Sequence, residues 1–240
     1  MEETLIRYRD VEINQEEHCV LSGVNLQLRK GEFVYLIGKV GSGKTTLLKT
    51  FYGELDIRKG EAEVLGFNMR PIKQKNVPKL RRRLGIVFQD FQLLTDRTIN
   101  DNLYFVLQAT GWKNKKLMKE RIVDVLTQVG METKGYKMPN ELSGGEQQRI
   151  VIARAMLNSP EIILADEPTG NLDVETSRQI TALLHTICLT GASVIMSTHN
   201  LALVKRFPGR VLRCEGHRII DVTDDFQKSF GPTQGGFILS

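Results

Sequence analysis

Cysteine is scarce in this 240-residue chain, and long apolar runs are missing from it. Its three cysteines, Cys19, Cys188 and Cys214, are widely spaced and form no CxxC or Cys/His pattern. They therefore indicate core or near-core thiols in a reducing compartment, not a disulfide framework. No apolar stretch approaches the ~18 residues that a spanning helix needs, and the first ten residues lack a secretion signal. We expect a soluble, cytoplasmic protein.

A strong excess of one charge is also missing. The chain has 33 Lys and Arg against 28 Asp and Glu, and the net charge of +5 does not by itself indicate a nucleic-acid-binding protein. Apolar residues at 41% predict an ordinary packed core. Two basic clusters are read as solvated helix faces, with anionic lipid headgroups or an acidic partner surface as the alternative. They comprise residues 81–83 and the group Lys113, Lys115, Lys116 and Lys119.

Short apolar runs alternate with longer helical stretches, which predicts an α/β fold with a mainly parallel core sheet. The buried-strand pattern covers residues 33–37, 84–88, 162–165 and 193–197. Helical spacing covers residues 44–52, 99–109, 116–129, 145–157 and 174–189. Residues 5–11 and 24–28 alternate like antiparallel strands and predict a β edge. We expect a domain over residues 1–223, a helical insertion at about 90–160, and a short tail, 224–240, that could be mobile.

The clearest motif lies between the strand that ends at residue 37 and the helix that follows. It fits the pattern GxxxxGK[ST] and reads Gly38, Lys39, Val40, Gly41, Ser42, Gly43, Lys44, Thr45 and Thr46. The glycines let backbone N–H groups turn toward phosphate oxygens, and the helix N-terminus adds positive potential. Lys44 supplies a charge for the outer phosphates and Thr45 a hydroxyl for Mg²⁺. Nucleotide binding alone would suit kinases, GTPases and ATPases equally.

Four further residues follow buried strands at the same predicted edge of the sheet. Asp166 is placed to reach the Mg²⁺ shell, and Glu167 to orient and deprotonate an attacking water. A simple acid pair at a helix N-terminus is the alternative. His199 is expected to contact the γ-phosphate or Glu167, and Gln89 could touch both metal and water.

The string LSGGEQQR at residues 142–149, taken with these motifs, resembles the nucleotide-binding domain of ABC ATPases over about residues 3–222. This resemblance implies an α/β fold of the P-loop NTPase kind, ABC type, with a helical subdomain. It also implies a second helix N-terminus, formed by Ser143, Gly144 and Gly145, that binds the γ-phosphate of an ATP held by another subunit. It implies a head-to-tail homodimer closed on two ATP molecules with Mg²⁺. It also places Asp173 in the loop that crosses to the partner subunit, and Gln89 as the link to a membrane partner.

Within that family, the strings at 88–94, 96–102 and 164–173 look most like those of cell-division ATPases; lipoprotein-release and macrolide-export ATPases are similar. The resemblance implies an ATP-hydrolysing subunit, peripheral on the inner face of the cell membrane, that drives an integral permease partner without nucleic acid. A soluble family member of translation or DNA maintenance is an alternative. Such proteins usually carry two cassettes or a long coiled-coil insertion. Purely structural ATP binding conflicts with Glu167 and His199.

Two departures from the family pattern concern the nucleotide site. Residues 12–18 lack the aromatic that usually stacks on adenine in the first hairpin. We expect weaker adenine packing, or packing that uses Tyr8, Ile13 or His18. The pair Lys39-Val40 replaces the more common Pro-Ser or Pro-Asn, which should alter the rim of the loop and leave its backbone intact.

Overall fold

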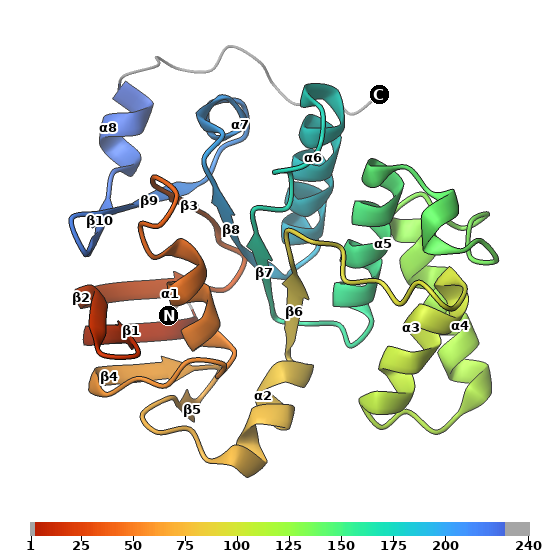
Figure 1. Ribbon diagram of the computed structural model, residues 1–240, viewed down its shortest axis with the longest axis horizontal. Coiled ribbons are helices and arrows are strands. Elements are labelled where there is room, and N and C mark those ends of the chain that lie inside the picture. Colours follow the sequence, from red (N-terminus) through yellow and green to blue (C-terminus); the bar gives the residue numbers. More distant parts are fainter. Residues whose placement is uncertain (1–2, 229–240) are drawn as a thin grey trace.

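The computed structural model describes residues 3–228, which form two sheets and the helices that cover them (Figure 1). The larger sheet has the strand order β10-β9-β3-β8-β7-β6. Its strands run parallel except β10, which is antiparallel to β9. They span Phe33–Ile37 (β3), Leu84–Val87 (β6), Ile162–Asp166 (β7), Ser193–Thr198 (β8), Arg210–Glu215 (β9) and Arg218–Asp221 (β10). The predicted α/β fold with a mainly parallel core sheet is confirmed.

The predicted antiparallel strands form a sheet of their own, with the order β2-β1-β4-β5. Its strands span Thr4–Gln15 (β1), His18–Arg29 (β2), Lys59–Val64 (β4) and Phe67–Asn68 (β5). The first two are longer than predicted and meet in a tight hairpin. Alternation along β1 turns Tyr8 and Ile13 into the core, where they are 1% and 0% exposed. Neither side chain is therefore available to pack on adenine, whereas His18 is exposed.

The helices between β6 and β7 gather on one side of the molecule (Figure 1). They span Ile99–Ala109 (α3), Lys115–Gln128 (α4) and Gly144–Met156 (α5), with a 3₁₀ turn at Pro139–Glu141 before α5. No strand occurs between residues 90 and 160. Helices α1 (Lys44–Phe51) and α6 (Val174–Leu189) follow β3 and β7 respectively. The short helices are α2 (Val77–Arg82), α7 (Leu201–Arg206) and α8 (Thr223–Lys228).

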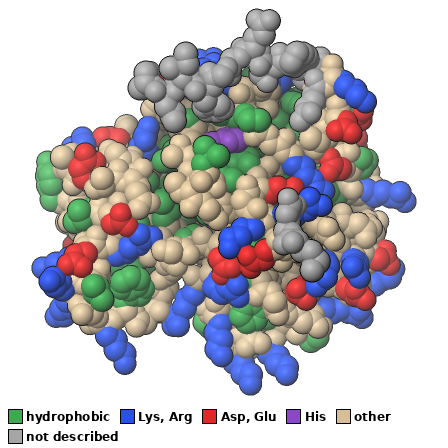
Figure 2. Space-filling model, turned by 180° about the vertical axis from the view of Figure 1, so that it is seen from behind, with side chains coloured by type: hydrophobic (Ala, Val, Ile, Leu, Met, Phe, Trp, Pro, Cys, Tyr) green, Lys and Arg blue, Asp and Glu red, His purple; other side chains and the backbone are tan. Residues whose placement is uncertain are grey.

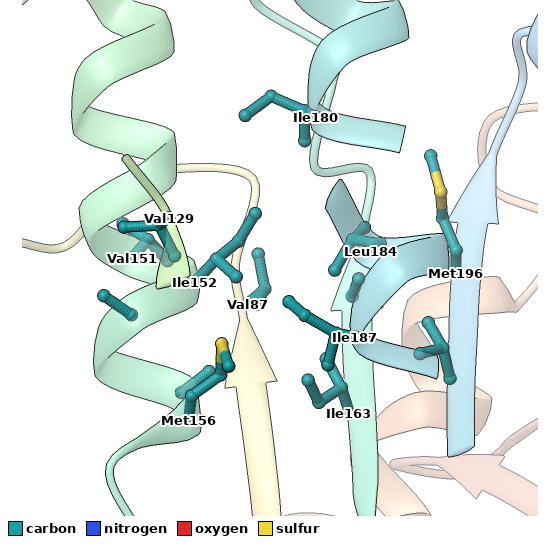
Figure 3. Packing of buried hydrophobic residues seen from close by; sticks show 14 of the residues in the cluster. Val87, Val129, Val151, Ile152, Met156, Ile163, Ile180, Leu184, Ile187 and Met196 are labelled. Atoms are coloured by element: carbon teal, nitrogen blue, oxygen red, sulfur yellow. The ribbon is translucent and has the colours of Figure 1, made fainter. Parts of the chain in front are cut away.

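The central strands of the larger sheet, β3, β7 and β8, are buried on both faces because their successive side chains enter two different cores. On β7, Ile163 packs with α5 and α6, whereas Leu164 packs with α1 and the antiparallel sheet. Figure 3 shows the first core, in which Ile152 and Met156 of α5 face Val87 of β6 and Val151 lies beside Val129. Each such buried side chain contributes roughly 1.5–3 kcal/mol, so this core fixes α5 against the sheet.

The sequence pattern did not predict the short strands and helices, and the prediction that all three cysteines are buried was wrong for one of them. Strands β4, β5, β9 and β10 and helices α2, α7 and α8 are at most six residues long, too short for a clear period. Cys188 and Cys214 are buried as predicted, but Cys19 is exposed because it lies beside the hairpin turn. Residues 224–228 of the expected tail belong to α8. The rest of the expected tail lies outside the described residues, and so does the prediction that it is mobile. None of the described helices is long and apolar enough to cross a membrane.

Candidate nucleotide site

The loop between β3 and α1 is shaped by glycines that no larger residue could replace without movement. A Cβ on Gly38 would lie 2.6 Å from the backbone oxygen of Cys214. Gly43 has φ +98° and caps α1, and a Cβ there would lie 2.9 Å from a methyl carbon of Val20. Because its N-cap is glycine, α1 offers its first N–H groups no side-chain acceptor. Such a terminus is suited to an anion.

Lys44 lies at the mouth of this loop and is only 7% exposed. Its Nζ donates hydrogen bonds to the carbonyl oxygens of Gly38, at 2.9 Å, and Lys39, at 3.3 Å. The same Nζ lies 3.4 Å from Oε1 of Glu167. The ammonium is therefore aimed across the loop at the carboxyl end of β7, while Thr45 and Val40 remain exposed at the rim.

Four side chains converge at the carboxyl ends of β7 and β8, which are adjacent parallel strands. The Ser197 hydroxyl donates to Oδ1 of Asp166, at 2.6 Å, and accepts the backbone N–H of Glu167, at 2.9 Å. His199 Nδ1 lies 2.9 Å from Oε2 of Glu167. Glu167 has φ +46°, an uncommon conformation for a non-glycine residue that this network holds in place. Sequence reasoning missed Ser197; its signal is a serine at the carboxyl end of a buried strand, two residues before His199.

Gln89 follows β6 at the same edge and is exposed. Its Nε2 lies 3.3 Å from the position that a Cβ on Gly170 would occupy, so its amide rests against the turn after Glu167. The structure thus brings Gln89, Glu167, His199 and Lys44 to one edge of the sheet. The catalytic and metal-binding roles assigned to them remain predictions.

The predicted second phosphate-facing helix terminus lies apart from the first, on the other side of β6 and β7 (Figure 1). Ser143 caps α5 by accepting the N–H of Glu146, at 3.3 Å, and its own N–H donates to Glu146 Oε2, at 2.9 Å. The backbone N–H of Ser143 and then the ammonium of Lys134 hold the pKa of Glu146 below its ordinary value. A Cβ on Gly145 would lie 2.5 Å from the Thr176 methyl carbon, so this turn packs tightly on α6.

Asp173 begins α6 as its N-cap. Its carboxylate accepts hydrogen bonds from the N–H groups of Glu175, at 3.0 Å, and Thr176, at 2.9 Å. The Thr176 hydroxyl and then these N–H groups lower the pKa of Asp173. Asp173 therefore has a structural task in its own chain, beside the Ser143 turn.

Arg154 is a further residue that sequence reasoning missed. Its guanidinium donates to the backbone oxygens of Gln92, at 2.6 Å, and Phe91, at 3.0 Å. Burial lowers the pKa of this guanidinium. Arg154 thereby fastens α5 to the segment that follows Gln89, and no spacing in the sequence marks it for this role.

A phosphate loop with a buried lysine, facing an acid pair at the carboxyl edge of a parallel sheet, defines the P-loop nucleotide hydrolases. Residues 21–170 match the family model of the ABC transporter ATPase domain, and this chain belongs to that family. It is therefore an ATP-binding, ATP-hydrolysing ABC ATPase.

Known proteins agree with this placement over most of the chain. The cell division ATP-binding protein FtsE of Streptococcus pneumoniae is 42% identical over 229 residues, which are 95% of this chain and 98% of that protein. The dimeric cassette MJ0796, solved in a post-hydrolysis state with ADP and Pi, is 31% identical with a TM-score of 0.78, covering 89% and 96% of the two chains. The cbiO1 subunit of Clostridium perfringens is 26% identical with a TM-score of 0.84, covering 91% and 88%.

Proposed function

We propose that this chain is the ATPase subunit of a cell-division ABC complex and drives an FtsX-like integral membrane partner from the inner face of the cell membrane. The observation that carries the proposal is the likeness to FtsE, which extends over nearly the full length of both proteins. We also propose residues 1–223 as the nucleotide-binding domain, with the helical subdomain at about 90–160 as its insertion.

In this proposal the phosphate loop from Gly38 to Thr46 holds ATP, and Glu167 orients and deprotonates the attacking water. His199 positions the Glu167 carboxylate through their hydrogen bond. The pair between Lys44 and Glu167 has a further consequence. An incoming phosphate competes for the ammonium, which leaves Oε1 of Glu167 to accept a hydrogen bond from water. ATP binding would thus activate the base directly, because the Lys44 ammonium exchanges the Glu167 carboxylate for a phosphate.

Mg²⁺ fits the oxygen donors at this edge. We assign it to the Thr45 hydroxyl, the Asp166 carboxylate and the amide oxygen of Gln89, which are hard ligands of the kind that Mg²⁺ prefers together with phosphate and water. Ser197 occupies only Oδ1 of Asp166, so Oδ2 makes no hydrogen bond within residues 3–228. When bound, the ion would neutralise developing charge on the phosphates.

We further propose a homodimer in which Ser143, Gly144, Gly145 and Asp173 face the nucleotide on the partner's loop. The dimeric MJ0796 structures support this arrangement. In each subunit the Ser143 turn packs on the start of α6, so both would move together when the dimer closes.

The experiment is purification of the tagged chain from native membranes in mild detergent. An FtsX-like permease should co-purify, and more of it should do so when Glu167→Gln is loaded with ATP. Co-purification of a permease of the lipoprotein-release or export kind would instead indicate that the chain drives transport. If the chain stays in the soluble fraction with no integral protein, the proposal is wrong.

A further inference from the structure

Two separate segments place unpaired cations along one edge of the molecule. Residues 70–83 include seven Lys and Arg and no acid, and residues 113–119 include four Lys and no acid. The first segment contains α2, and the second comprises the end of the α3–α4 loop and the first residues of α4. Figure 2 shows Lys and Arg side chains projecting from this lower edge of the molecule. We call it the basic edge and define it by the exposed side chains of Lys73, Lys75, Lys79, Arg82, Lys113, Lys115 and Lys119.

Part of the cationic run serves the fold and is left out of that definition. Arg81 donates to the backbone oxygen of Tyr52, at 3.0 Å, and Arg83 makes two hydrogen bonds with Glu161, at 2.5 and 3.0 Å. Lys116 has a long contact with Glu120, at 3.9 Å. The seven side chains of the basic edge, in contrast, make no ion pair with any residue in 3–228. Their charge is therefore uncompensated.

The two segments are continuous in space. Nη2 of Arg82 lies 3.3 Å from the position of a Cβ on Gly111, so the end of α2 reaches the loop between α3 and α4. This edge also lies away from the catalytic groups. Helix α2 leads into the amino end of β6, whereas Glu167 and His199 follow the carboxyl ends of β7 and β8 (Figure 1). A ligand on the basic edge would leave the nucleotide site open.

From this geometry we propose that the basic edge binds the anionic headgroups of a lipid bilayer. Six of its seven cations are lysines, which act as mobile point charges and suit a fluid layer of phosphates better than one fixed partner. Leu117 lies among them with half of its surface exposed and can enter the headgroup region. No exposed aromatic side chain interleaves the lysines, as a single-stranded nucleic acid would favour. Trp112 is half-buried and donates to Asn158, at 3.0 Å.

This inference rests on the proposed function, which brings the chain to a membrane. It adds a direct lipid contact that a permease partner does not require. The contact would hold the subunit near its partner and raise the rate at which the two meet. It should also weaken with salt, because exposed charges are screened beyond about 8 Å at physiological ionic strength.

The experiment is sedimentation of the full chain with vesicles of phosphatidylcholine alone or with about one third phosphatidylglycerol. We expect binding to the anionic vesicles only, and its loss between about 0.05 and 0.5 M NaCl. Each lysine near an anionic leaflet is worth about a fivefold gain in partitioning. The variant with Lys75, Lys79, Lys115 and Lys119 changed to Gln should therefore need at least about tenfold more lipid for half-binding, with unchanged ATPase activity.

A charge-matched control removes four cations from other exposed sites by changing Arg58, Lys59, Arg206 and Arg218 to Gln. This variant should bind anionic vesicles as the original chain does. Equal loss in both variants, or no binding by the original chain, would overturn the proposal. Tighter binding of polyglutamate than of anionic vesicles at equal charge would overturn it in favour of an acidic protein partner. If the permease co-purifies but the chain does not bind vesicles, the proposed lipid contact is wrong and the proposed function is unaffected.

Discussion

The two helix N-termini that are proposed to face phosphate, those of α1 and α5, are built in opposite ways. Helix α1 begins after Gly43, which has a left-handed backbone and no side chain to cap the helix. Helix α5 begins after Ser143, whose hydroxyl and backbone N–H both bond to Glu146. One terminus leaves its N–H groups for an external anion, and the other already satisfies part of its own with a carboxylate.

This difference separates a permanent site from a conditional one. A phosphate at α1 replaces nothing on the helix itself, so this terminus can hold nucleotide in a single subunit. In the proposed dimer, a phosphate at α5 would arrive with the partner and would compete with the Glu146 carboxylate for the Ser143 N–H. We infer that the α1 side governs ATP affinity and chemistry, and that the α5 side governs dimer closure. Four changes, taken from the largest expected effect to the smallest, test this division.

Glu167→Gln should give the largest effect, since it removes the proposed base from the α1 side. Turnover should fall about 10²–10⁴-fold, the usual contribution of a general base, while ATP affinity persists because the Lys44 ammonium loses a charged competitor. Steady-state hydrolysis and equilibrium binding of labelled ATP measure the two quantities. Glu63→Gln, which loses only a half-exposed pair with Arg7, is the control. Turnover near that of the control would place the base elsewhere.

The sequence predicts those parts of this site that form a motif of fixed spacing or that directly follow a strand. The loop at 38–46 and the pair Asp166 and Glu167 can be placed because each follows a buried apolar run. Spacing cannot show a contact between distant elements. The hydrogen bonds of Ser197 to Asp166 and of Arg154 to the Phe91 backbone join residues 31 and 63 positions apart. These contacts depend on how the strands and α5 pack.

Gly43→Ala tests whether the α1 terminus depends on its glycine. A Cβ there meets Val20 at 2.9 Å and Leu21 at 3.1 Å, so the loop must shift. The shift would misalign N–H groups that face the phosphates, and a lost hydrogen bond to a charged group costs about 1.5–3 kcal/mol. We therefore expect ATP affinity to fall by at least about tenfold, measured by titration with labelled nucleotide. Gly66→Ala is the matched control. Gly66 also has positive φ, at +79°, but nothing lies within 4 Å of its Cβ position. It should lose about 1–2 kcal/mol of stability from backbone strain alone. Equal affinity in both variants would contradict a requirement for open space at Gly43.

The fold divides in the same way between predictable and unpredictable parts. The pattern finds β3, β7 and α6 because each is long or uniformly apolar. It misses β9, where buried and half-exposed positions mix, and α2, which has only six residues. The antiparallel strands show why burial is harder to predict than element type. The alternation along residues 5–11 predicts a strand, yet only the packing of Tyr8 against Phe51 and Thr50 shows that its ring is unavailable to a ligand.

Ser143→Ala tests the α5 side. Loss of an N-cap should lower the free energy of unfolding by about 1 kcal/mol. Binding of ATP to a single subunit should be unchanged, whereas turnover should fall about tenfold, because the partner's phosphate loses a hydroxyl donor in a pre-organised site. Chemical denaturation, nucleotide titration and hydrolysis separate the three effects. Asn114→Ala, which removes the N-cap of α4, should cost similar stability with no change in turnover. If the two variants hydrolyse ATP equally, the α5 terminus does not face a nucleotide.

Acid titration of the α5 cap should give the smallest effect. The pKa of Glu146 is lowered in the folded chain, first by the Ser143 N–H and then by Lys134, so the unfolded chain takes up this proton at higher pH. The carboxylate therefore stabilises the fold above the ordinary value of 4.5, and this contribution is lost as the pH falls through the lowered pKa.

Glu146→Gln should be less stable than the original chain by at most about 1 kcal/mol near pH 7, since the group is partly exposed. The gap should narrow as the pH falls below 4.5 and close once the pH is below the lowered pKa of Glu146, in urea denaturation followed by circular dichroism. A gap that persists in acid would show that hydrogen-bond geometry, not charge, holds the cap. That result would leave an arriving phosphate no electrostatic reason to displace Glu146, and the distinction between the two helix termini would then rest on Gly43 alone.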